Sequence, residues 1–89
     1  MLQLEDLRLS HNSLAGNVPP TLGKLEALRS ISLDHNSIGG AIPEEIGLLS
    51  KRLRSLKLQS NRLNGLLPLF FKQPEFRTVD IDLSENPFW

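Results

Sequence analysis

The sequence predicts a right-handed parallel β-solenoid of the α/β class, in which every repeat contributes one short strand and one returning segment. Two observations predict it. Asparagines recur 24 residues apart from Asn12 to Asn36, and 25 residues apart from there to Asn61 and again to Asn86. A pattern of apolar residues, glycine and proline recurs in step with them. A period of about 20 to 50 residues is typical of solenoids, in which each repeat buries its apolar face against its neighbours.

The pattern that follows each asparagine is the same in the first three repeats. An aliphatic residue comes first, then glycine, and then an aliphatic residue followed by proline. These residues are Leu14, Gly16, Val18 and Pro19, then Ile38, Gly40, Ile42 and Pro43, then Leu63, Gly65, Leu67 and Pro68. We therefore expect a single domain over 1–89, with repeats at about 4–27, 28–52 and 53–77 and a partial repeat at 78–89.

Each repeat opens with an alternation of apolar and polar residues. A period of two predicts a β-strand whose apolar residues face the core and whose polar residues face outward. The inward residues are Leu7 and Leu9, Ile31 and Leu33, Leu56 and Leu58, and Ile81 and Leu83. Because a long return rather than a tight hairpin separates successive strands, we expect them to pair in parallel, one strand per repeat.

A turn must follow each strand, and Asn12, Asn36, Asn61 and Asn86 occupy it. The asparagine side chain has both an amide donor and a carbonyl acceptor, so it can satisfy backbone groups that the end of a strand leaves unpaired. We therefore expect these four residues to form a structural ladder along the solenoid.

The returning segments are expected to form irregular or short helical turns on the opposite, convex side. Pro19 and Pro43 suit the start of a helical turn, because proline fixes φ and lacks a backbone N–H. Leu22 and Leu25 lie three residues apart, which places both on one face of a single helical turn, and Ile46 repeats the pattern in the next copy.

The third returning segment departs from this pattern. Alignment with the earlier copies places Phe71 inward and both Leu69 and Phe70 outward. Pro74 replaces the second inward leucine, and we expect Phe76 to fill the gap from a neighbouring position.

Together these segments predict one continuous apolar core. Its residues are Leu4, Leu7, Leu9, Leu14, Val18, Leu22, Leu25, Leu28, Ile31, Leu33, Ile38, Ile42, Ile46, Leu49, Leu53, Leu56, Leu58, Leu63, Leu67, Phe71, Ile81 and Leu83.

Composition excludes several classes of protein. Ten basic and ten acidic residues balance, so charge offers no case for binding nucleic acid or an anionic membrane. The chain has no cysteine, which excludes a disulfide framework, a thiolate nucleophile and a cysteine-ligated zinc site. No apolar run approaches the roughly 18 residues of a membrane span. The first residues lack the basic region and apolar core of a signal peptide.

The segment from Leu28 to Asn36, followed by Ile38-Gly39-Gly40-Ala41-Ile42-Pro43, resembles the plant-type leucine-rich repeat, whose consensus is Leu-x-x-Leu-x-Leu-x-x-Asn and then Leu-x-Gly-x-Ile-Pro. The resemblance extends over nearly the whole chain. It implies a horseshoe arc with the strands on its concave face. Such arrays form the ectodomains of receptor-like kinases and receptor-like proteins, and also polygalacturonase inhibitors, so the resemblance implies an extracellular or cell-surface location.

The function that this resemblance implies is binding of a protein or peptide ligand, within a larger receptor-like or defence protein. Two alternatives stay open: an inhibitor of a secreted cell-wall-degrading enzyme, and passive spacer repeats. We expect no enzyme activity and no cofactor, because the sequence holds neither a Gly-x-Ser-x-Gly elbow nor a nucleophile with a base at a catalytic spacing. The glycines follow the repeat rather than a phosphate-binding loop.

The outward strand residues and the first turn residues form the candidate binding face, with no contribution expected from nucleic acid or membrane. Its members are Asp6, Arg8, Ser10, His11, Ser30, Ser32, Asp34, His35, Ser55, Lys57, Gln59, Asp80 and Asp82. Neighbouring strands lie about 4.8 Å apart, so Lys57 and Asp82 should be adjacent. The alternative for any one of these residues is a merely solvated side chain.

Two groups on this face could carry other chemistry. His11 and His35 stand in one column and could be two metal ligands, but the next residue in that column is Ser60, so we expect no metal site. Asp80 and Asp82 could form a carboxylate pair for acid–base chemistry. With Lys57 beside them, we expect a surface salt bridge instead.

The C-terminal apolar residues Leu69, Phe70, Phe88 and Trp89 are expected to form a seam. An uncapped solenoid end exposes core side chains, so these residues would contact missing flanking repeats or a second copy of the chain. The alternative is that Phe70 rotates into the core space that Pro74 leaves open. The chain begins and ends inside the repeat pattern, and we expect it to be a fragment.

Overall fold

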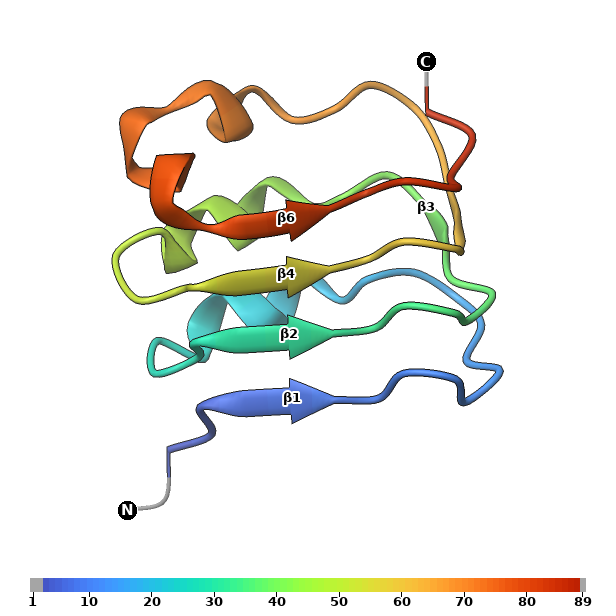
Figure 1. The fold of residues 1–89 in the computed structure, drawn as a ribbon, viewed down its shortest axis with the longest axis horizontal. Coiled ribbons are helices and arrows are strands. Elements are labelled where there is room, and N and C mark those ends of the chain that lie inside the picture. The colour runs from blue at the N-terminus through green and yellow to red at the C-terminus, as the bar shows by residue number, and fades with distance from the viewer. Residues whose placement is uncertain (1–2, 89) are drawn as a thin grey trace.

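The computed structural model describes residues 3–88, and it forms a solenoid built on one parallel sheet. The sheet has the order β1-β2-β4-β6, with strands at Asp6–Arg8, Ser30–Ser32, Ser55–Lys57 and Asp80–Asp82. Figure 1 shows these strands side by side, with the cyan and green helical turns behind them and the orange turns beyond β6. The predicted fold is confirmed: each repeat contributes one parallel strand, in the register that pairs Leu7 with Ile31, and Ile31 with Leu56.

The returning segments contain short 3₁₀ helices. These are η1 (Pro20–Lys24), η2 (Glu44–Leu49), η3 (Leu69–Lys72) and η4 (Pro74–Thr78). Pro19, Pro43 and Pro68 precede the first three helices in extended conformation, with φ between −72° and −60°. The proline ring restricts φ to this range, so each helix starts at the same point of its repeat.

Two further contacts hold successive returns together. Strand β3 (Gly39–Gly40) pairs in parallel with β5 (Arg62–Leu63) in a second, two-stranded sheet. Helix η1 packs on η2 so closely that a Cβ on Gly23 would lie 2.5 Å from the backbone oxygen of Glu45. Glycine is therefore required for this close approach.

The core lies between the sheet and the helices and confirms most of the predicted inward residues. The predicted residues that are buried are Val18, Leu22, Leu28, Ile31, Leu33, Ile38, Ile42, Ile46, Leu49, Leu53, Leu56, Leu58 and Leu63. Phe70, Phe76 and Val79 are buried in addition to the predicted set. Leu7, Leu14, Phe71, Ile81 and Leu83 are only partly buried and pack against this cluster.

The predicted burial of four leucines is wrong. Leu4 and Leu67 are each 46% exposed, and Leu9 and Leu25 are each 38% exposed. In a solenoid a side chain is covered by the repeats on both sides. Within residues 3–88 the first repeat has a neighbouring repeat on one side only, and only the bridge between Gly65 and Phe88 covers the far side of the third return. These leucines therefore lack the cover that a complete neighbouring repeat would supply.

The placement of Phe70 is also corrected. Phe70 is 8% exposed and Phe71 is only partly buried, the reverse of the predicted order. Gly47 of the preceding repeat explains the exchange, because a Cβ there would lie 3.1 Å from the Phe70 ring. The ring fills the space that glycine leaves open. Phe76 is 3% exposed and lies 5.0 Å from Phe70 between ring centroids, so it does fill the gap that Pro74 creates.

Candidate binding face

The outward side of β1, β2, β4 and β6, together with the first turn residues after each strand, is called the strand face here. The register of the sheet aligns its residues in columns across the four strands. One column holds Asp6, Ser30, Ser55 and Asp80, and the next holds Arg8, Ser32, Lys57 and Asp82. Backbone hydrogen bonds from His11 to Asp34 and from His35 to Gln59 continue the alignment beyond the strands.

Charged side chains lie at both ends of the strand face. Lys57 Nζ lies 2.9 Å from Asp80 Oδ2, and Arg8 Nη2 lies 3.9 Å from Asp6 Oδ2. Lys57 and Asp82 are register partners, but the ion pair of Lys57 runs diagonally to Asp80. The Asp80 side chain is 74% exposed, so solvent screens the pair and its contribution to stability is at most about 1 kcal/mol.

Small hydroxyl residues occupy the middle of the strand face. Ser30 and Ser32 on β2, and Ser55 on β4, lie between the Asp6–Arg8 pair and the Lys57–Asp80 pair. Their short side chains leave the sheet surface low there, so the backbone of another chain could approach it closely. Each hydroxyl can both donate and accept a hydrogen bond.

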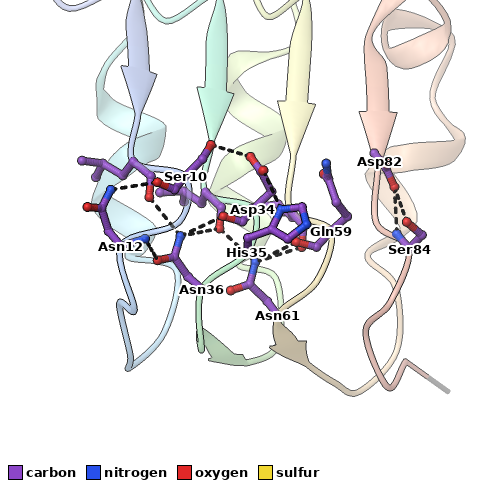
Figure 2. A network of polar contacts seen from close by, with 12 residues as sticks. Ser10, Asn12, Asp34, His35, Asn36, Gln59, Asn61, Asp82 and Ser84 are labelled. Atoms are coloured by element: carbon purple, nitrogen blue, oxygen red, sulfur yellow. Dashed lines mark hydrogen bonds and ion pairs between the residues drawn. The ribbon is translucent and has the colours of Figure 1, made fainter.

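A polar cluster joins the turns that follow β1 and β2 (Figure 2). The Ser10 hydroxyl donates to Asp34 Oδ1 over 2.6 Å, and His35 Nδ1 lies 2.9 Å from Asp34 Oδ2. Partial burial raises the pKa of Asp34, but the hydrogen bonds from Ser10 and His35, a backbone hydrogen bond and the charge of His35 together leave the pKa below its ordinary value of 3.8. The carboxyl group is therefore ionised at neutral pH.

The two histidines of the face stack on each other. The imidazole centroids of His11 and His35 lie 4.2 Å apart, with 13° between the ring planes. Both residues have a left-handed backbone, with φ of 58° and 56°. Ser60 and Glu85 hold the same position in the other repeats with φ of 58° and 57°, so the turn itself imposes this conformation.

A second serine–aspartate pair lies on the last strand and differs from the first. The Ser84 hydroxyl donates to Asp82 Oδ1 over 2.6 Å, and the Ser84 backbone N–H donates to the same oxygen over 3.0 Å. These bonds hold the pKa of Asp82 below its ordinary value. Here donor and acceptor are two residues apart, whereas Ser10 and Asp34 belong to different repeats.

The asparagines lie behind the strand face and bridge the repeats. Asn36 Oδ1 accepts hydrogen bonds from the backbone N–H groups of Asn12 and Leu14, each over 2.9 Å. Its Nδ2 donates to the backbone oxygens of Leu9 and Leu33. Asn61 and Asn86 make equivalent bonds in the next repeats, while the Asn12 side chain donates locally to the Ser10 backbone oxygen.

Sequence reasoning missed two features of this region. It identified His11 and His35 as a pair but did not recognise Asp34 as a third polar group beside them. Residue spacing carries no signal for this contact, because it depends on the left-handed turn at His35. The second feature is Gln59 Oε1, which is buried and accepts no hydrogen bond from any described residue.

Two hollows lie elsewhere on the described surface. Both lie beside the turns that lead into the strands and share Glu26 and Arg52, and Lys24 lines one of them. Neither hollow includes a residue of the strand face. Between residues 3 and 88, no helix has the length and apolar character that crossing a membrane requires.

Comparison with known proteins places the repeats in a family. The Leucine Rich Repeat family profile matches residues 3–25, 27–49 and 52–73. No curated protein sequence matches the chain significantly.

Three solved structures illustrate the similarity. The ectodomain of the receptor kinase SOBIR1 from Arabidopsis thaliana is 31% identical, with a TM-score of 0.83 over 92% of this chain and 44% of that one. A plant ice-binding protein is 36% identical, with a TM-score of 0.88 over 96% of this chain and 27% of that one. The ectodomain of the Arabidopsis receptor kinase HAESA, in complex with an N-terminally extended IDA peptide hormone ligand, is 30% identical, with a TM-score of 0.84 over 94% of this chain and 14% of that one.

This chain spans less than half the length of each of these structures. Within that span it shares their repeat, with one parallel strand and one short helical return per turn of the solenoid. The profile match covers most of the sequence, and the receptor-kinase neighbours carry the same plant-type arrangement. This protein therefore belongs to the leucine-rich repeat family, as a plant-type array similar to the ectodomains of receptor kinases.

Proposed function

We propose that this chain is a binding module that takes a peptide or protein ligand on its strand face, as part of a larger extracellular or cell-surface protein. The observation that carries the proposal is the low strip of serines on β2 and β4 between two charged pairs. Similarity to ectodomains such as HAESA, whose structure holds a peptide hormone ligand, supports the same reading.

The proposed ligand lies across the strands in extended form. Its backbone meets the hydroxyls of Ser30, Ser32 and Ser55, which can satisfy both N–H and C=O groups. Its charged side chains meet Arg8 at one end and Asp80 at the other, which are 76% and 74% exposed and so available for contact. A ligand with an acidic group near one end and a basic group near the other fits this arrangement.

Other functions receive less support from the same surface. An ice-binding face has to match a crystal lattice, which calls for one residue type repeated at a fixed spacing. The outward columns instead change from strand to strand, as in the column Arg8, Ser32, Lys57 and Asp82. Inhibition of a secreted enzyme would use the same face, and in that case the enzyme is the ligand. Passive spacer repeats would bind nothing there.

We also propose that two of the four C-terminal apolar residues mediate contact with a second copy of the chain. Leu69 is 75% exposed and Phe88 is partly exposed, so both are available for contact with a second copy. Phe70 no longer belongs to this group because it is buried, and Trp89 lies outside the described residues.

The test selects peptides from a random display library on the purified chain and measures their affinity. The chain is used at a concentration where sedimentation shows a monomer, with Leu69→Ser available if it self-associates. Arg8→Ala and Asp80→Ala should each weaken binding of the selected peptide by about 1 kcal/mol, or roughly fivefold in Kd. If either residue is a hot spot, its variant should lose more than about 2 kcal/mol. Circular dichroism should not change.

Lys24→Ala and Lys51→Ala are the matched controls, because both lysines are exposed and lie away from the strand face. Binding that is lost in these controls and retained in the strand-face variants would reject the proposed surface. Failure to select any saturable binder would favour spacer repeats.

A further inference from the structure

We propose that His11, Asp34 and His35 form a binding site for a divalent transition-metal ion of the zinc(II) type. The ligands are one imidazole nitrogen from each histidine and Oδ2 of Asp34. In the structure these ligand atoms all lie within 4.8 Å of one another. Ligand atoms around tetrahedral zinc are about 3.4 Å apart. The two exposed rings must therefore leave their stacked arrangement, with 13° between the ring planes, so that one nitrogen of each points at the same ion.

The backbone already aims both histidines in the same direction. They occupy the same position in adjacent repeats and share a left-handed φ, which is why their rings stack 4.2 Å apart. The fold does not require histidine there, because Ser60 and Glu85 adopt the same conformation in the later repeats. The imidazole pair is therefore a feature of this surface rather than of the repeat.

Hydrogen bonds orient the Asp34 carboxylate for binding a cation. Ser10 donates its hydroxyl to Oδ1 of Asp34 over 2.6 Å, which orients the group and leaves Oδ2 facing His35 Nδ1 at 2.9 Å. A metal ion would replace this hydrogen bond, with Nδ1 and Oδ2 moving slightly apart so that each lies about 2.0–2.2 Å from the ion. Hydrogen bonds that orient a ligating carboxylate are typical of metal sites and strengthen them.

The set of donors selects the class of metal. Two imidazole nitrogens and one carboxylate oxygen suit Zn²⁺, Cu²⁺ or Ni²⁺, whereas Mg²⁺ and Ca²⁺ prefer oxygen ligands alone. Three protein ligands leave a coordination position open to water or to a donor from a partner. Gln59, with its unpaired buried oxygen, follows Asp34 in the same column on the next strand. It adds an acceptor to the surroundings of the site.

The experiment uses the full chain without a histidine tag, titrated with Zn²⁺ at about pH 7.5 by calorimetry and by NMR of the imidazole nitrogens. The expected result is one zinc per chain, with one nitrogen of each of the two imidazoles shifting together. His11→Asn, His35→Asn and Asp34→Asn should each weaken binding at least tenfold. Asparagine is chosen for the histidines because it tolerates the left-handed backbone.

Asp82→Asn is the matched control, since Asp82 has the same serine hydrogen bond but no neighbouring imidazole, and its zinc affinity should not change. The NMR titration of the wild-type chain decides the question even if a variant fails to fold. The proposal is overturned if only one imidazole shifts, if Mg²⁺ binds as tightly as Zn²⁺, or if zinc binds only between two chains, as sedimentation would reveal.

Discussion

Within residues 3–88 the second repeat has a neighbour on each side, whereas the first has a neighbour on one side only, and the same residue types behave differently in the two places. Leu33 is 4% exposed, while its counterpart Leu9 is 38% exposed. Asn61 is buried, while Asn12 lies in solvent. In a solenoid, burial therefore depends on the position of a repeat in the stack as much as on the residue that occupies it.

The largest difference between the two places is expected for core truncation. Ile31 is 1% exposed between β1 and β4, so Ile31→Ala should lower the free energy of unfolding by about 2–5 kcal/mol. Leu9→Ala removes a side chain that is already 38% exposed and should cost less than half as much. Urea unfolding of both variants measures the difference. Equal shifts of the two midpoints would show that stacking does not control burial energy here.

The regular parts of this architecture can be predicted from the sequence because the same pattern of apolar and polar residues recurs in each repeat. Alternating residues such as Ile31 and Leu33 specify which side of a strand faces inward, and the long returns leave only parallel pairing. The period then determines which residues of neighbouring strands meet. These rules specify the register of the first repeat as well as the second, in which Leu7 pairs with Ile31. They do not specify how deeply a residue such as Leu9 is buried.

The irregular parts depend on contacts between repeats that no single repeat encodes. Phe70 turns inward because Gly47, one repeat earlier, has no side chain. The cluster around Asp34 forms because a left-handed turn places Ser10 and His35 on opposite sides of one carboxylate. Both outcomes rest on the exact geometry of adjacent returns, which residue spacing does not reveal.

The next difference is expected along the asparagines. Asn61 bridges two repeats, donating to Leu33 and Leu58 backbone oxygens and accepting from the Ile38 N–H over 3.1 Å. Asn61→Ala leaves these buried groups unpaired and should destabilise the fold by about 1–3 kcal/mol. Asn12→Ala removes only the exposed hydrogen bond from Asn12 Nδ2 to the Ser10 backbone oxygen. Its loss of stability should be well below that of Asn61→Ala. Thermal unfolding would contradict this view if the two variants lost the same stability.

The smallest expected effect separates the two serine–aspartate pairs by pH. The bond from Ser10 to Asp34 joins different repeats and exists only in the folded chain, whereas Ser84 and Asp82 are two residues apart and can meet in the unfolded chain as well. Because folding lowers the pKa of Asp34 below 3.8, the ionised carboxylate contributes stability that is fully present above that pH. This contribution is lost as the pH falls through the lower pKa of the folded state.

Asp34→Asn should therefore reduce the loss of stability between roughly pH 5 and pH 3, and Asp82→Asn should change it less. Urea unfolding at several pH values measures both slopes, with the wild-type chain as reference. The expected difference is under about 1 kcal/mol, because part of the Asp34 side chain remains open to solvent. If Asp82→Asn flattened the profile more than Asp34→Asn, the local pair would be the stronger one, and the contact between repeats would contribute less to folding than its geometry suggests.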